Sequence, residues 1–154
     1  MNGKTNAMRI LDSKKIPYTM HEYDGLMSAA EVAAVLGQDP EKVFKTLVTD
    51  GGNRTYFVFV IPVEETLDLK KAAKAAGEKS VAMIHVSEIN ALTGYVRGGC
   101  SPIGMRKQYK TFYNETALSQ ETIMVSAGKI GYQVELSPDD LIKLTRGKTA
   151  DLVV

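Results

Sequence analysis

The sequence contains one cysteine and no tryptophan among its 154 residues. A single cysteine excludes an internal disulfide. The two histidines and the cysteine are widely separated and match no spacing that is typical of metal ligands. We therefore predict neither a metal site nor a bound cofactor.

A long hydrophobic run is also missing. The longest apolar stretch, Tyr56–Pro62, is too short to cross a bilayer, which excludes a membrane-spanning segment. Residues Met1–Lys15 are polar and charged and do not have the pattern of an export signal. Together with the single cysteine, these absences predict a cytoplasmic protein that does not interact with membranes. The length predicts a single domain, residues 1–154, with a sizeable core.

Neither sign of charge dominates, because 19 Lys and Arg residues face 18 Asp and Glu residues and leave a net charge of +1. Proteins that bind nucleic acid unaided usually carry a basic face. Here the positive residues gather only in two local groups. Each group is either solvated surface or part of a weak, salt-sensitive contact with nucleic acid. The groups are Lys70, Lys71 and Lys74, and Arg106, Lys107 and Lys110.

Helix and strand patterns alternate irregularly along the chain. Cap residues and glycine stops predict helices, and short apolar runs between turn signals predict strands. Helices are expected at residues 6–15, 28–36, 68–77, 87–92 and 137–147. Strands are expected at 18–23, 43–49, 54–61, 81–84, 110–113, 123–126 and 132–136, with 152–154 as an edge strand. The pattern favours the α+β class, with a curved mixed or antiparallel sheet, or a barrel, and peripheral helices.

Three glycines and a proline fall within the seven residues Gly98–Gly104. Glycine permits positive φ and close approach of a ligand, and proline fixes one φ, so the remaining amides are held in defined directions. Such a loop can hold an anion or an oxyanion, or it can be a tight structural turn. Gly99 and Gly104 have the spacing of a phosphate loop. Met105 and Arg106 follow where Lys and Ser or Thr are required, which excludes a nucleoside triphosphate site.

Lys45 lies in a predicted strand whose two faces are otherwise largely apolar. It either points outward from an edge strand or reaches a lined cavity, where it would be a fixed cation with a lowered pKa. Ser126 ends another strand at a second glycine turn, where it either lines a site or caps its own turn. Cys100 has no recognisable activating base and is interpreted as a small apolar filler. His21 and His85 are given only local roles at strand edges.

Three segments together resemble one known family. They are Lys45-Thr46-Leu47, the loop Gly98–Gly104 and Val125–Lys129. The chain is similar, over nearly its whole length, to the YbaK-type Cys-tRNA(Pro) deacylases, which are related to the editing domain inserted in bacterial prolyl-tRNA synthetases. The resemblance implies hydrolysis of the ester that joins a wrongly attached amino acid to the 3′ end of tRNA. The implied partners are the acceptor end of aminoacyl-tRNA and prolyl-tRNA synthetase.

The resemblance also implies the site residues. Lys45 matches the family's lysine that contacts the tRNA terminus, and Gly98 matches the backbone position that orients the ester carbonyl, so both are expected in the catalytic centre. The expected substrate-binding residues are Tyr23, Thr46, Gly99, Ser101, Pro102, Gly104 and Ser126. The implied mechanism is substrate-assisted, because the cysteinyl thiol attacks its own ester carbonyl. The loop amides and Lys45 would stabilise the charge that develops.

One position departs from the family pattern. Well-known members carry an aspartate in the strand after the serine turn, where this chain has Gln133. The exchange predicts altered recognition of the amino group of the substrate. The alternative function is that of a non-catalytic module, which binds a tRNA end or a nucleotide or acts as an adaptor on a synthetase.

Overall fold

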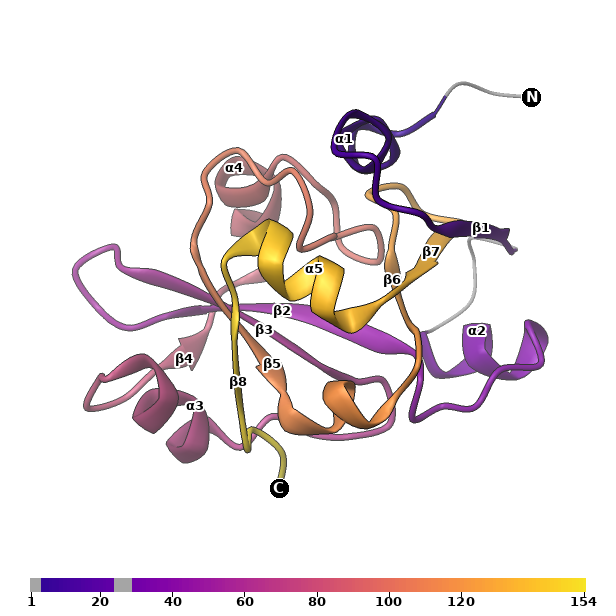
Figure 1. Cartoon of the computed structure of the whole chain (residues 1–154). Helices are drawn as coiled ribbons and strands as arrows, with labels where there is room; N and C mark the ends of the chain where they lie inside the picture. The colour runs from indigo at the N-terminus through magenta and orange to yellow at the C-terminus, as the bar shows by residue number, and fades with distance from the viewer. Residues whose placement is uncertain (1–3, 24–28) are drawn as a thin grey trace.

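The computed structural model of the chain describes residues 4–23 and 29–154 (Figure 1). The helices are α1 (Asn6–Ser13), α2 (Ala29–Val35), α3 (Leu69–Ala76), α4 (Ile89–Thr93) and α5 (Pro138–Thr145), with short 3₁₀ turns η1 (Val86–Glu88) and η2 (Glu115–Ser119). The strands are β1 (Thr19–Glu22), β2 (Phe44–Asp50), β3 (Tyr56–Pro62), β4 (Ala82–Met83), β5 (Lys110–Asn114), β6 (Ile123–Ser126), β7 (Tyr132–Leu136) and β8 (Lys148–Ala150).

These strands form two sheets. One has three antiparallel strands in the order β1-β7-β6, and the other has five strands in the order β4-β2-β3-β5-β8. The larger sheet is mixed, because β2 pairs antiparallel with β3 and β4, whereas β5 pairs parallel with β3 and β8. A parallel bridge between Val43 and Met124 joins the two sheets. The predicted α+β class is confirmed, and the described strands form curved sheets rather than a closed barrel.

The five-stranded sheet has a hydrophobic cluster on each face, because β3 is buried on both sides. Val58 and Val60 pack with residues of α1, α5 and the three-stranded sheet. Phe57, Phe59 and Ile61 pack instead with α3 and the end of the chain. Figure 1 shows the corresponding arrangement, with α1 beside the smaller sheet and α3 beside β4 at the far end of the larger one.

Two helix starts predicted from cap residues are confirmed. The Asp68 carboxylate accepts from the amides of Lys70 and Lys71, and Ser137 caps α5 with Pro138 at its first position. Gly77 ends α3 in the left-handed conformation, as expected. The predicted capping serine of α2, Ser28, lies outside the described residues.

The end of α5 differs from the prediction that Gly147 closes the helix. Arg146 takes the left-handed conformation, with φ 56°, and Gly147 follows it. A Cβ at Gly147 would lie 2.5 Å from Cε1 of Tyr113, so glycine is required there for close packing against the ring.

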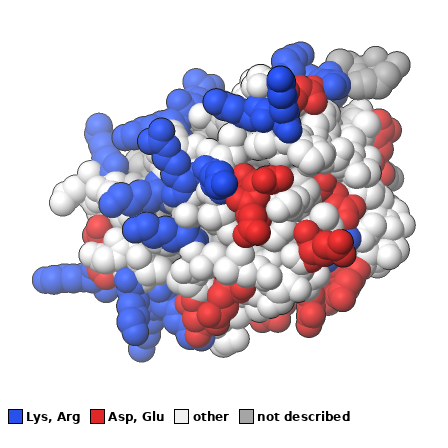
Figure 2. Space-filling view, in the orientation of Figure 1, with Lys and Arg blue, Asp and Glu red and all other residues white. Residues whose placement is uncertain are grey.

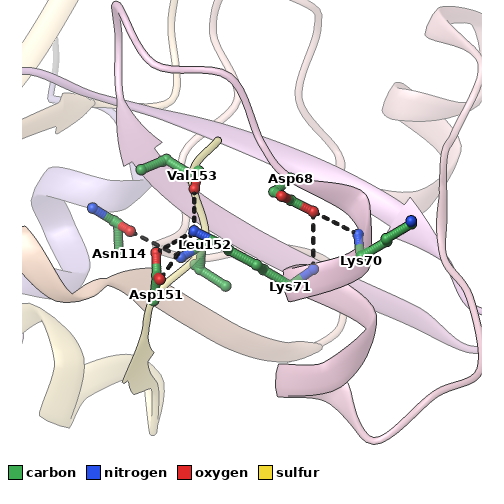
Figure 3. Close-up of polar contacts among 7 residues, drawn as sticks. All are labelled: Asp68, Lys70, Lys71, Asn114, Asp151, Leu152 and Val153. Atoms are coloured by element: carbon green, nitrogen blue, oxygen red, sulfur yellow. Dashed lines mark hydrogen bonds and ion pairs between the residues drawn. The ribbon is translucent and has the colours of Figure 1, made fainter.

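The C-terminal strand also differs from the prediction. β8 forms at residues 148–150, and Val153 makes only an isolated bridge with Leu67. Side chains help to hold the tail, as Figure 3 shows. The Leu152 amide donates to Oδ1 of Asn114 at 3.0 Å, and the Lys71 ammonium donates to Asp151 and to the Val153 carbonyl. Two backbone hydrogen bonds add to these contacts, from the Asp68 amide to the Leu152 carbonyl at 2.8 Å and from the Val154 amide to the Thr66 carbonyl at 3.0 Å.

Candidate active site

A cavity of about 720 Å³ is lined by residues of both sheets. Four parts of the chain that are distant in sequence form its walls. They are β2, the segment from β4 to α4, the glycine loop, and the adjoining ends of β1, β6 and β7. The backbone hydrogen bond from the Tyr23 amide to the Gly131 carbonyl, 2.9 Å long, holds the end of β1 at the β6–β7 turn.

The cavity brings together five of the predicted site residues, namely Tyr23, Lys45, Thr46, Gly98 and Ser126. The other four are not in its lining: Gly99, Ser101, Pro102 and Gly104. Ser101 is fully buried, and its Oγ accepts from the Ile103 amide at 3.2 Å within the loop. These four residues shape the loop that forms the wall.

The loop begins with a tight turn that places Gly98 at the cavity. The Gly99 amide donates to the Val96 carbonyl at 2.9 Å, and Gly98 has φ 85°. A hydrogen-bonded turn with positive φ at its third residue is a type II turn, which favours glycine there. Within the described part of the chain, the Gly98 amide has no hydrogen-bond partner. An unpaired amide at a cavity wall is available to an oxygen atom of a ligand.

Tyr95 packs against two glycine-containing loops, residues 98–104 and residues 126–131. Its hydroxyl donates to the Ile103 carbonyl, and its ring is buried. A Cβ at Gly128 would lie 2.8 Å from Cε1 of this ring, and a Cβ at Gly104 would lie 3.0 Å from its hydroxyl. Both glycines have positive φ. The two loops therefore pack against one aromatic side chain.

The same loops also meet through their backbones. A Cβ at Gly99 would lie 3.0 Å from the Ile130 nitrogen, so only glycine allows this approach. Ser126, at the start of the second loop, lines the cavity, and its Oγ accepts from the Gly128 amide at 3.1 Å. Both interpretations of Ser126 thus apply, since it caps its own turn and contributes to the wall.

Lys45 lies on an uncovered part of β2. The neighbouring strand β4 pairs with β2 only at Thr49 and Asp50, so β2 is an edge strand at Lys45. The side chain is partly buried and lines the cavity. Burial lowers the pKa of Lys45, and the charge of Glu65 opposes this shift. Lys45 therefore lies on an edge strand and also lines the cavity, so the two alternatives expected from the sequence both apply.

Two buried polar atoms have no hydrogen-bond partner in the described part of the chain. They are Thr46 Oγ1 and Gln133 Oε1, and both residues line this cavity. Gln133 is only 6% exposed. Buried polar groups in folded proteins are nearly always paired, so two unpaired atoms in residues that line one cavity mark Thr46 and Gln133 as candidate parts of the site.

Sequence reasoning missed several other lining residues, including Arg97 and Cys100. Arg97 is exposed beside Gly98 and carried no motif of its own. Cys100 lines the cavity, although the sequence suggested only a packing role. Burial raises the pKa of Cys100 to about 11, so this residue is a neutral thiol near pH 7. The available signal for both residues was their closeness to Gly98 in the sequence, since Arg97 precedes it and Cys100 follows it by two positions.

The other titratable residues singled out in the sequence lie elsewhere. His21 is hydrogen-bonded at 2.8 Å to Glu135 on the neighbouring strand and is not in the cavity lining. In the first of the two basic groups, the Lys71 ammonium is paired with Asp151 and donates to the Val153 carbonyl. Residues 4–23 and 29–154 contain no group of three His, Cys, Asp or Glu side chains that could bind a metal ion. Over the same residues, no helix combines the length and apolar character needed to span a bilayer.

Comparisons with known proteins are consistent with one another. Residues 24–144 match the family model described as "Aminoacyl-tRNA editing domain". The "Putative Cys-tRNA(Pro)/Cys-tRNA(Cys) deacylase EbsC" of Enterococcus faecalis is 48% identical over 152 residues, which cover 97% of this chain and 93% of that protein. The "Prolyl-tRNA editing protein ProX" of Acetoanaerobium sticklandii is 20% identical and covers 95% of this chain and 92% of its own length.

The fold is also found in solved structures. One is a crystal structure of "a putative trans-editing enzyme for prolyl tRNA synthetase", which superposes with a TM-score of 0.85 at 23% identity and covers 99% of both chains. At that level of identity, the match establishes the shared fold.

Proposed function

The chain belongs to the aminoacyl-tRNA editing domain family and is an aminoacyl-tRNA hydrolase, and from that premise we propose that it removes cysteine from Cys-tRNA(Pro) in trans. The name of the Enterococcus faecalis protein, which is 48% identical, supports this substrate. The observation that carries the proposal is the pair of unpaired buried atoms, Thr46 Oγ1 and Gln133 Oε1, at a cavity that also holds a free amide and a lysine. Such a cavity suits a small polar acyl group attached to an anion.

The proposed reaction uses the thiol of the substrate as the nucleophile. Its sulfur forms a bond to the ester carbonyl carbon, the bond from that carbon to the ribose oxygen breaks, and the thiol proton passes to the ribose oxygen. The product is free tRNA and a four-membered thiolactone, which water then opens to cysteine. The cavity contributes by holding the acyl group in the conformation that allows attack.

In the proposed reaction, two residues would stabilise the charge that develops. The amide of Gly98 would donate to the carbonyl oxygen as it becomes negative, and Lys45 would neutralise the leaving ribose oxygen or its phosphate. Tyr23, Thr46 and Ser126 would contact the aminoacyl group. The loop residues that do not line the cavity would act through the backbone, by holding Gly98 in its turn.

The surroundings of Cys100 support a mechanism without a protein nucleophile. Its pKa is raised to about 11, so very little thiolate is present at neutral pH. His21 cannot serve it as a base from where it lies, because His21 is bonded to Glu135 and is not among the lining residues.

Deacylation assays with purified protein test the proposal. We expect faster loss of cysteine from Cys-tRNA(Pro) than in buffer, and no acceleration with Ala-tRNA(Pro), because alanine has no thiol. Lys45→Ala should lower the rate strongly, whereas Lys79→Ala, which changes an exposed lysine not in the cavity lining, should not. Equal rates for Lys45→Ala and wild type would overturn the assignment.

We further propose that prolyl-tRNA synthetase assists the reaction. The net charge of +1 gives the protein little general attraction for RNA, so delivery by a partner that already holds the tRNA would help. Adding the synthetase at limiting enzyme should increase the rate of deacylation. An unchanged rate would count against the partnership.

A further inference from the structure

One wall of the cavity is apolar and partly open to solvent. Met83 in β4, Val86 in η1 and Ile89 at the start of α4 all line it. Met83 is 45% exposed and Val86 is 55% exposed. Exposed apolar side chains grouped at the mouth of a cavity indicate a surface that a partner covers.

The lining residues that come from the three-stranded sheet and its adjoining ends are mostly polar, with Ile130 as the exception. Tyr23, Ser126 and Gln133 come from the three-stranded sheet and its adjoining ends, and the Oε1 atom of Gln133 is unpaired in the described part of the chain. Strand β2 runs along the cavity and contributes residues 44–48 to its lining. The lining is therefore mostly polar where the three-stranded sheet contributes to it and apolar where Met83, Val86 and Ile89 do, with Lys45 on strand β2.

The charge of the lining residues further restricts which ligand the cavity can bind. Lys45 and Arg97 line the cavity, and its described lining contains no Asp or Glu. Lys129 adjoins the lining residue Ile130 and is exposed. On the face drawn in Figure 2, Lys and Arg lie mostly along the left and the top, and Asp and Glu lie mostly at the centre, the right and the bottom. The site thus favours an anion that also has a flat apolar part.

We propose that the wall of Met83, Val86 and Ile89 binds the terminal nucleobase of a single-stranded RNA end, with Arg97 facing its phosphates, while the polar lining residues bind the acyl group. A nucleobase joined to ribose and phosphate combines an apolar face with negative charge, and bases pack on apolar platforms independently of sequence. The inference rests on the proposed function, because it assigns the two halves of that substrate to the apolar and the polar parts of the lining.

Val86→Ser tests the nucleobase wall, and Val35→Ser is its matched control. Both valines are 55% exposed, but Val35, at the end of α2, is not in the cavity lining. We expect Val86→Ser to raise the KM for Cys-tRNA(Pro) about fivefold with little change in kcat, because two methyl groups lose their contact with the base. Val35→Ser should match wild type. With cysteine methyl ester, which has no base, Val86→Ser and wild type should react equally.

A binding measurement separates this inference from the deacylase proposal. The trinucleotide 5′-CCA-3′ should shift the NMR signal of the Met83 methyl group in wild type. Val86→Ser should bind this trinucleotide with about fivefold lower affinity. If wild type fails to deacylate but the trinucleotide shifts Met83, the proposed function fails and the base site stands. If deacylation proceeds while Met83 is unmoved and Val86→Ser equals Val35→Ser, the base site is wrong.

Discussion

Gly98→Ala is the substitution that most directly probes the proposed catalytic amide. Gly98 is the third residue of a type II turn, with φ 85°, and a Cβ there would meet nothing closer than 3.8 Å. The effect is therefore conformational rather than steric. Types I and II differ by rotation of the central peptide, and alanine at the third position favours type I. The hydrogen bond from the Gly99 amide to Val96 can persist in both types.

That rotation carries the consequence for the reaction. The central peptide contains the amide of residue 98, so a change to type I turns this N–H through about half a circle, as the standard dihedral angles of the two types require. Removal of one such donor in other enzymes costs about 100- to 1,000-fold in rate. We expect a loss of about 100-fold in single-turnover deacylation of Cys-tRNA(Pro) by Gly98→Ala.

Gly77→Ala is the matched control. Gly77 ends α3 with φ 74°, and nothing lies within 4 Å of a Cβ there. Alanine in this conformation should lower the free energy of unfolding by about 1–2 kcal/mol, as measured by urea denaturation, and leave deacylation unchanged. Deacylation by Gly98→Ala within about twofold of wild type would refute the role of the amide, because that rate would leave no room for a lost oxyanion donor.

Three further substitutions have defined outcomes. Asn114→Ala should lower the free energy of unfolding in urea by about 1–3 kcal/mol, because the buried Leu152 amide loses its acceptor; an unchanged free energy of unfolding would contradict this reasoning. Burial favours the neutral form of Glu135, but hydrogen bonds from Lys42, Thr122 and His21 prevail and lower its pKa from 4.5 to about 2. Wild type should therefore lose stability as the pH falls from 4.5 to about 2, and Glu135→Gln should show a flatter profile in acid unfolding; identical slopes would contradict the assignment. Gln133→Met should leave unfolding stability unchanged or higher, because a buried unpaired oxygen is removed, while raising the KM for Cys-tRNA(Pro); an unchanged KM would exclude contact with substrate.

The sequence predicts best what depends on local signals. The starts of α3 and α5 follow from Asp68 and from Ser137-Pro138, and both are found where expected. The neighbouring strands predicted at 43–49 and 54–61, separated by a turn signal, are found as β2 and β3 and pair antiparallel. These features need only a few neighbouring residues, so the sequence contains the required information.

Features that depend on distant contacts are missed. β8 forms at residues 148–150 because β5 offers a parallel edge there, and the terminal residues are held by the side chains of Asn114 and Lys71. Arg97 reaches the cavity because Gly99 allows its loop to pack against Ile130. No local pattern encodes such approaches between segments that are far apart in the chain.

Tyr95 affects how a cavity of this kind can diverge during evolution. Its ring occupies the space that a side chain at Gly128 would need, and its hydroxyl, together with Asn6 and Ile10, occupies the space at Gly104, so neither glycine can be replaced without moving these neighbours. The two loops are therefore expected to be inherited as a unit. Variation in substrate range is left to positions such as Met83 and Gln133, where side chains can be exchanged while the backbone of the loops stays in place.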